Sequence, residues 1–149
     1  MASLNPNSVK FLIIHSSLTS PTQRITLKEL ERKHRMAGRL AIGYHFVIPR
    51  DGTYEVGRPM NRVGQHTPGQ NQHSLGICMV GGVDKSGKPE DNYTQAQYTT
   101  LKWLLVNLSF GFPNSKVVGH NHFAPNSPCP CFPVGDWLTT QGMTNLKPT

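Results

Sequence analysis

The chain has few acidic residues, few cysteines and no long apolar run, and each shortage excludes a class of protein. Eight Asp and Glu against 15 Lys and Arg give a formal net charge of +7 over 149 residues. No stretch approaches the roughly 18 apolar residues of a membrane-spanning helix. Three cysteines are an odd number, which argues against a disulfide framework. We therefore expect a soluble protein with reduced thiols and no membrane segment.

A secretion signal and a basic arm are also missing. The amino terminus lacks a positively charged segment, and the apolar run from Phe11 to Ile14 is too short for the core of a signal peptide. The positive charge favours an anionic partner, but the basic residues are scattered from Lys10 to Lys147 instead of forming one block. We therefore expect synthesis in the cytoplasm and no nucleic-acid partner.

The first half of the chain alternates strand and helix signals. Residues 9–15 form an apolar run that ends at His15, just before turn-forming serines. Residues 27–37 have helical spacing and follow a capping-box pattern. Residues 44–48 and 53–56 flank an Asp-Gly pair, so they predict a β-hairpin.

The second half repeats the alternation and ends in an irregular segment. Residues 75–80 read as a buried strand, and a helix is predicted from the cap at Thr94 to Gly111. A short strand at residues 117–118 follows. Residues 121–133 contain four prolines and two cysteines, so we expect irregular backbone there.

This order of elements predicts an α/β fold with a central mixed β-sheet flanked by helices. A chain of 149 residues with 36% hydrophobic content can bury one core. No repeat or low-complexity segment divides it. We therefore expect a single domain over residues 1–149.

Three metal-binding side chains stand at or beyond the ends of predicted strands. His15 ends the first strand, His120 follows the last, and Cys129 lies nine residues further on. Catalytic zinc takes three protein ligands of these types and leaves a fourth position for water. Spacing alone does not establish a zinc site, because seven histidines and three cysteines allow many such sets of three.

Four longer segments make a more specific pattern. They are, in order, FLIIHSS (11–17), GYHFVIPRDGTYEVGRP (43–59), VGQHTPGQNQHSLGICMVGG (63–82) and VVGHNHFAPNSPCPCF (117–132). Together they resemble the zinc-dependent N-acetylmuramoyl-L-alanine amidases, which share their fold with peptidoglycan-recognition proteins. The likeness is greatest to short phage endolysins called lysozymes. The resemblance implies hydrolysis of the amide between N-acetylmuramic acid and L-alanine in bacterial peptidoglycan.

The resemblance also implies roles for individual residues. His15, His120 and Cys129 match the ligands of one zinc ion, which activates water for attack on the amide carbonyl. Tyr44 matches an active-site tyrosine that can hydrogen-bond the tetrahedral oxyanion, a contact whose loss at comparable sites costs about 10²–10³ in rate. His66 matches a histidine that lines the substrate groove.

The sequence departs from its phage relatives beside the cysteine ligand. There, a lysine usually stands two residues before the cysteine, whereas this chain has Ser127. Pro128 reads as a one-residue insertion, and alignment around it places Asn126 at the lysine's position instead. Neither residue is cationic, so turnover is expected to be slower unless a group such as His122 supports the oxyanion.

Two other residues compete as ligands. His122 lies two residues from His120, and Cys131 two residues from Cys129. We prefer Cys129 because the pattern Cys-Pro-x-Phe matches from that position. The remaining candidates are expected to be core, packing or surface residues: Cys78, His34, His45 and His73.

The predicted function is therefore that of a phage lysis enzyme. It would be a monomer in the host cytoplasm that reaches peptidoglycan after the membrane is permeabilised. One alternative is a non-catalytic peptidoglycan-binding module of the same fold, but purely recognising members typically lack the ligand that Cys129 provides. Another is a second role implied by the resemblance, binding and inhibition of the phage RNA polymerase.

Overall fold

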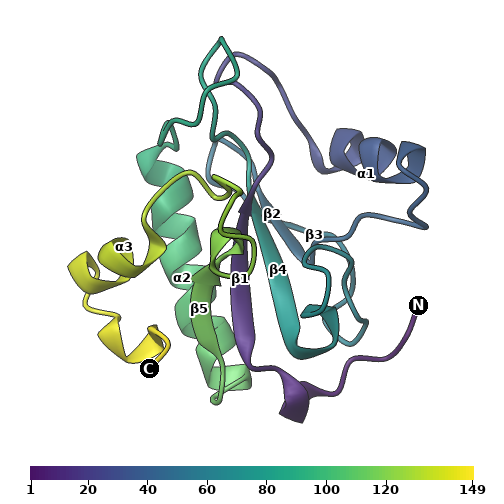
Figure 1. Ribbon diagram of the computed structural model, residues 1–149, viewed down its shortest axis with the longest axis vertical. Helices are drawn as coiled ribbons and strands as arrows, with labels where there is room; N and C mark the ends of the chain where they lie inside the picture. The colour runs from purple at the N-terminus through teal and green to yellow at the C-terminus, as the bar shows by residue number, and fades with distance from the viewer.

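The computed structural model describes all 149 residues and is built on one five-stranded sheet in the order β3-β2-β4-β1-β5 (Figure 1). The strands β2, β4, β1 and β5 run parallel, and β3 pairs antiparallel with β2. The sheet is therefore mixed, as predicted. The strand bounds are β1 Phe11–Ser16, β2 Phe46–Ile48, β3 Glu55–Val56, β4 Ser74–Met79 and β5 Lys116–Gly119.

Three α-helices accompany the sheet, and two of them begin where the sequence predicts. They are α1 (Leu27–Met36), α2 (Gln95–Gly111) and α3 (Val134–Thr140). The Thr26 side chain accepts from the Glu29 N–H at the start of α1. Thr94 and Gln97 form a reciprocal capping box at the start of α2. No helix is both long and apolar enough to cross a membrane.

The two faces of the sheet contact different helices. Alternate strand residues such as Leu12, Ile14 and Ile77 pack with the α2 leucines in one core cluster. On the opposite face, Val47 and Cys78 pack with residues of α1 and its flanking loops in a second cluster. In Figure 1, α2 runs beside the strands, whereas α1 stands apart from them on the other side.

The structure shortens both strands of the predicted hairpin and adds one helix. The strand predicted over residues 44–48 begins only at Phe46. The second strand, predicted over residues 53–56, spans only Glu55–Val56. Helix α3 was not predicted, because it is short and has no side-chain cap at its start. The segment between β5 and α3 has the expected irregular backbone apart from one 3-10 turn, His120–His122. Three further 3-10 turns are Pro6–Ser8, Asn71–His73 and Thr144–Leu146.

Candidate metal centre and active site

His15 and His120 meet because their strands are adjacent and parallel. Ile14 pairs with Gly119 in the register of β1 and β5, and the residue that follows each of them in the chain is one of these histidines. Their ring centroids lie 4.6 Å apart. Ligand sites in parallel sheets form at the carboxyl ends of the strands, which is where both residues stand.

Cys129 reaches the same place through contacts of the irregular segment. The Asn121 N–H donates to the Cys129 carbonyl at 2.9 Å, and the Tyr93 hydroxyl donates to the Pro130 carbonyl at 2.6 Å. Pro130 packs directly on Gly119, where a Cβ atom would lie only 2.7 Å from its Cδ. A glycine at the end of β5 therefore lets the cysteine segment approach the sheet.

The three side chains could bind a metal ion. One donor atom from each of His15, His120 and Cys129 lies within 4.8 Å of the other two. Two imidazoles and one thiol are the donor types of catalytic zinc centres. His15 and Cys129 are buried, whereas His120 is partly exposed and leaves the cluster accessible.

Burial sets the protonation of these groups. It lowers the pKa of His15 well below its usual value, and the neighbouring His66 and His120 lower it further. Both candidate imidazole ligands are therefore neutral near pH 7, because burial also lowers the pKa of His120. Burial raises the pKa of the Cys129 thiol to about 12, although the Ser16 N–H, 3.1 Å from its sulfur, opposes this shift. A bound cation would favour the thiolate.

Tyr44 lies beside this cluster, with its ring centroid 5.1 Å from that of His15. Burial raises the pKa of its hydroxyl well above the usual value, and the nearby Cys78 and Cys129 thiols raise it further. The phenol therefore stays protonated at any physiological pH and can donate a hydrogen bond. That is the property required of a group that stabilises a developing oxyanion.

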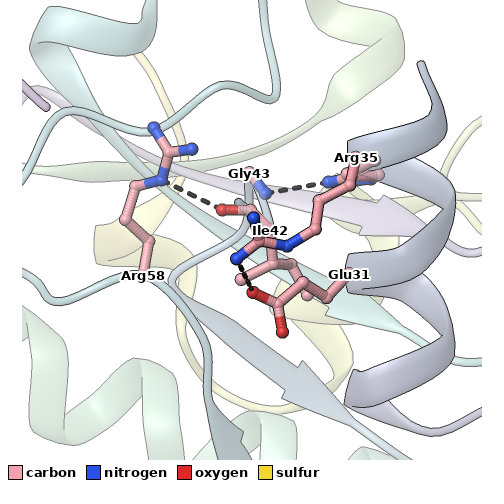
Figure 2. Close-up of polar contacts among 6 residues, drawn as sticks. Glu31, Arg35, Ile42, Gly43 and Arg58 are labelled. Atoms are coloured by element: carbon pink, nitrogen blue, oxygen red, sulfur yellow. Dashed lines mark hydrogen bonds and ion pairs between the residues drawn. The ribbon is translucent and has the colours of Figure 1, made fainter. Parts of the chain in front are cut away.

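The backbone before Tyr44 is held from two sides. The Gly43 N–H donates to Nδ1 of His34 on α1 at 2.8 Å. The Arg58 Nε donates to the Ile42 carbonyl at 3.0 Å. Figure 2 shows both contacts converging on the Ile42–Gly43 peptide and also draws the exposed Glu31–Arg35 ion pair of α1.

The sequence does not predict that His34 and Arg58 hold the Ile42–Gly43 peptide. His34 falls on the apolar stripe of α1 with Leu27 and Leu30, which is the one sequence signal for a buried role. Arg58 is 6% exposed although it carries a charge. Only the structure shows that its donors reach the carbonyls of Ile42 and Val63.

His66 is buried next to His15, with its Nδ1 2.9 Å from the Nε2 of His15. The resemblance predicts a place for it in the substrate groove. Its 7% exposure leaves little surface for a substrate. The structure therefore gives His66 a direct partner in the candidate metal centre.

The residues proposed for oxyanion support are not brought together. The Ser127 Oγ accepts from the Cys129 N–H at 3.3 Å, which shapes the loop before the cysteine. Asn126 is exposed. The exposed His122 ring lies 4.9 Å from that of Phe123 and 6.4 Å from that of Phe11, which begins β1.

The other candidate residues lie outside the cluster. Cys131 is half-buried in a left-handed backbone conformation with φ of 68° and is not part of the ligand group. Cys78 is fully buried in the sheet, as predicted. His45 is buried between the Gly76 N–H and the Arg62 carbonyl. His73 is exposed, as expected for a turn residue.

Comparison with known proteins agrees with this geometry. The profile of the N-acetylmuramoyl-L-alanine amidase family matches residues 5–132. The endolysin of Escherichia phage T7 is 40% identical over 130 residues, which cover 87% of this chain and 85% of that protein. The chain therefore belongs to the N-acetylmuramoyl-L-alanine amidase family.

Solved structures show the same fold. The amidase LysC from Clostridium intestinale superposes with a TM-score of 0.79 at 27% identity and covers 95% of this chain and 91% of its own. Drosophila PGRP-LB, a peptidoglycan-recognition protein, gives 0.77 at 23% identity, with 95% and 85% covered. The predicted amidase fold is confirmed, and the protein is an amidase that acts on peptidoglycan.

Proposed function

We propose that the protein is a phage endolysin in which His15, His120 and Cys129 hold one zinc ion. The observation that carries this proposal is the convergence of their donor atoms within 4.8 Å of one another, with the Tyr44 ring 5.1 Å from that of His15. Zinc in such a site supplies a water whose pKa is lowered to about 7. The T7 relative is itself an endolysin, which supports a role in host lysis.

The protein's own residues would contribute position and charge stabilisation. The two neutral imidazoles and the Cys129 sulfur would hold the ion, with the Ser16 N–H sharing charge on that sulfur at 3.1 Å. The Tyr44 phenol would donate to the oxygen of the attacked carbonyl as it becomes negative. Inhibition of a phage RNA polymerase stays a prediction.

The product of hydrolysis tests the reaction. Cleavage of the lactyl amide exposes amino-terminal alanine on the released peptides and creates no reducing sugar. Purified protein should therefore release new alanine amino groups from cell walls, with one zinc bound per chain. A rise in reducing ends without new amino groups would mean glycosidase chemistry, which requires a pair of carboxylates instead.

Replacing Tyr44 by Phe tests the oxyanion contact. Only the hydroxyl is removed, so zinc content and thermal stability should stay the same while kcat falls about 10²–10³-fold. Steady-state kinetics on a soluble muropeptide would measure this, with Tyr54→Phe, an exposed tyrosine, as the matched control. An unchanged kcat would make Tyr44 a packing residue.

A further inference from the structure

A row of hydrogen bonds leads from His15 away from the candidate metal centre. Nε2 of His15 lies 2.9 Å from Nδ1 of His66, and Nε2 of His66 lies 3.4 Å from Oγ of Ser74. The Ser74 hydroxyl donates to the Gln70 carbonyl at 2.7 Å. The Thr67 hydroxyl is within 3.2 Å of the ring nitrogens at the His15–His66 contact. Hydrolysis of the amide bond does not by itself require any of these hydrogen bonds.

The direction of each hydrogen bond follows from counting protons. The single proton of the Ser74 hydroxyl goes to the Gln70 carbonyl, so its oxygen accepts from Nε2–H of His66. A neutral imidazole carries one proton, so Nδ1 of His66 accepts and Nε2 of His15 donates to it. His15 then has an unprotonated Nδ1, which lies 4.0 Å from the Cys129 sulfur.

Packing holds the His66 ring in this orientation. A Cβ atom at Gly76 would lie 2.6 Å from Cγ of the ring, and one at Gly64 would lie 2.7 Å from its Cδ2. The two glycines therefore form a slot that only a flat ring fills. The His66 backbone N–H is fixed by the Asn71 side chain at 3.0 Å. The ring has no room to turn toward a substrate.

We propose that His66 is a positioning residue that fixes the tautomer and orientation of His15, so that Nδ1 of His15 is the metal donor. The inference rests on the proposed zinc site and changes the role of His66 from substrate contact to ligand support. Hydrogen-bond partners of metal-bound histidines typically contribute 10–100-fold to metal affinity or activity. Ser74 and Thr67 support His66 in turn.

Zinc affinity of two His66 variants tests this role. His66→Leu removes the acceptor for Nε2–H of His15, whereas the side-chain oxygen of His66→Asn occupies the position of Nδ1 and can still accept. Titration against a competing chelator should show zinc binding about 10–100-fold weaker in His66→Leu. It should be restored most of the way in His66→Asn. The exposed His73→Leu is the matched control and should bind zinc like the unsubstituted chain.

The tautomer itself gives a readout that needs neither zinc nor activity. Two-bond ¹H–¹⁵N spectra of the metal-free protein should show the proton of His15 on Nε2, and a mixture of tautomers in His66→Leu. A proton on Nδ1 in the unsubstituted chain would overturn the proposal even if His66→Leu fails to fold. So would a raised KM with unchanged zinc affinity, which is the signature of a substrate contact. A chain that binds no zinc at all would instead contradict the proposed function.

Discussion

The two faces of the sheet use burial in different ways. On the α2 face, the strands contribute apolar residues such as Leu12 and Ile77, which pack with Leu101 and Leu105. The one buried polar side chain of α2 is Gln97, which donates to the carbonyls of Ile48 and Val80. On the other face, His15 and His45 are as deeply buried, yet each ring is hydrogen-bonded. The α2 face thus stabilises the fold, and the other face can hold polar groups because their partners are fixed.

Removing a candidate metal ligand is expected to have the largest effect on activity, while leaving the packing of the α2 face unchanged. Cys129→Ala should lose zinc and reduce hydrolysis to background, since three ligands are needed to hold a hydrolytic zinc. Stability of the metal-free protein should change by only about 1 kcal/mol, because the α2 core is untouched. Metal analysis and chemical denaturation would measure both. If Cys129→Ala keeps its zinc and Cys131→Ala loses it, Cys131 is the ligand.

A cavity on the α2 face should have the opposite effect. Leu105 is fully buried in the middle of α2, so Leu105→Ala should lower the free energy of unfolding by about 2–5 kcal/mol. Because the site lies on the other face, kcat of the folded protein should be preserved. Denaturant titration combined with kinetics at low temperature would test this. A large fall in kcat at full occupancy of the folded state would show that the faces are coupled.

This contrast also explains what the sequence could predict. The leucines of α2 recur at helical spacing and the strands are apolar runs, so the core and the α/β class follow from periodicity alone. His15, His120 and Cys129 were assigned by resemblance to known motifs, and the structure brings them together. The contact between His15 and His66 was not predictable, because it depends on the slot between Gly64 and Gly76.

The two faces should respond differently to acid. Burial lowers the pKa of His45 from 6.5 to about 4, and burial with the nearby Arg39 lowers the pKa of His34 to about 4. Between these pH values the unfolded chain binds protons that the folded chain does not, so stability falls as the pH drops from 6.5 to 4. The loss from His45 alone is up to roughly 3 kcal/mol.

Urea denaturation of the metal-free protein at several pH values would measure this dependence. His34→Asn should make the curve shallower, because the amide oxygen can still accept from the Gly43 N–H but does not titrate. Leu105→Ala, on the apolar face, should lower the whole curve without changing its slope. A stability that is constant between pH 7 and pH 4 would contradict the pKa directions assigned to these histidines.

The smallest effect is expected at His122, and it bears on the missing lysine. His122 contacts Phe123 and lies near Phe11 at the start of β1, whereas His15 stands near the end of the same strand. The His122 ring packs against these aromatic rings and makes no hydrogen bond to His15, His120 or Cys129, so it is not positioned to stabilise charge beside the metal centre. His122→Ala should therefore change kcat less than about twofold. The variants Ser127→Lys and Asn126→Lys test whether a cation at either position raises kcat. Ser127→Lys also removes the acceptor for the Cys129 N–H. We expect the gain to be larger for Asn126→Lys, because Asn126 is exposed and the Cys129 loop keeps its hydrogen bond. A large loss of kcat in His122→Ala at unchanged zinc content would show instead that the 3-10 turn after β5 rearranges during the reaction and brings this imidazole to the oxyanion.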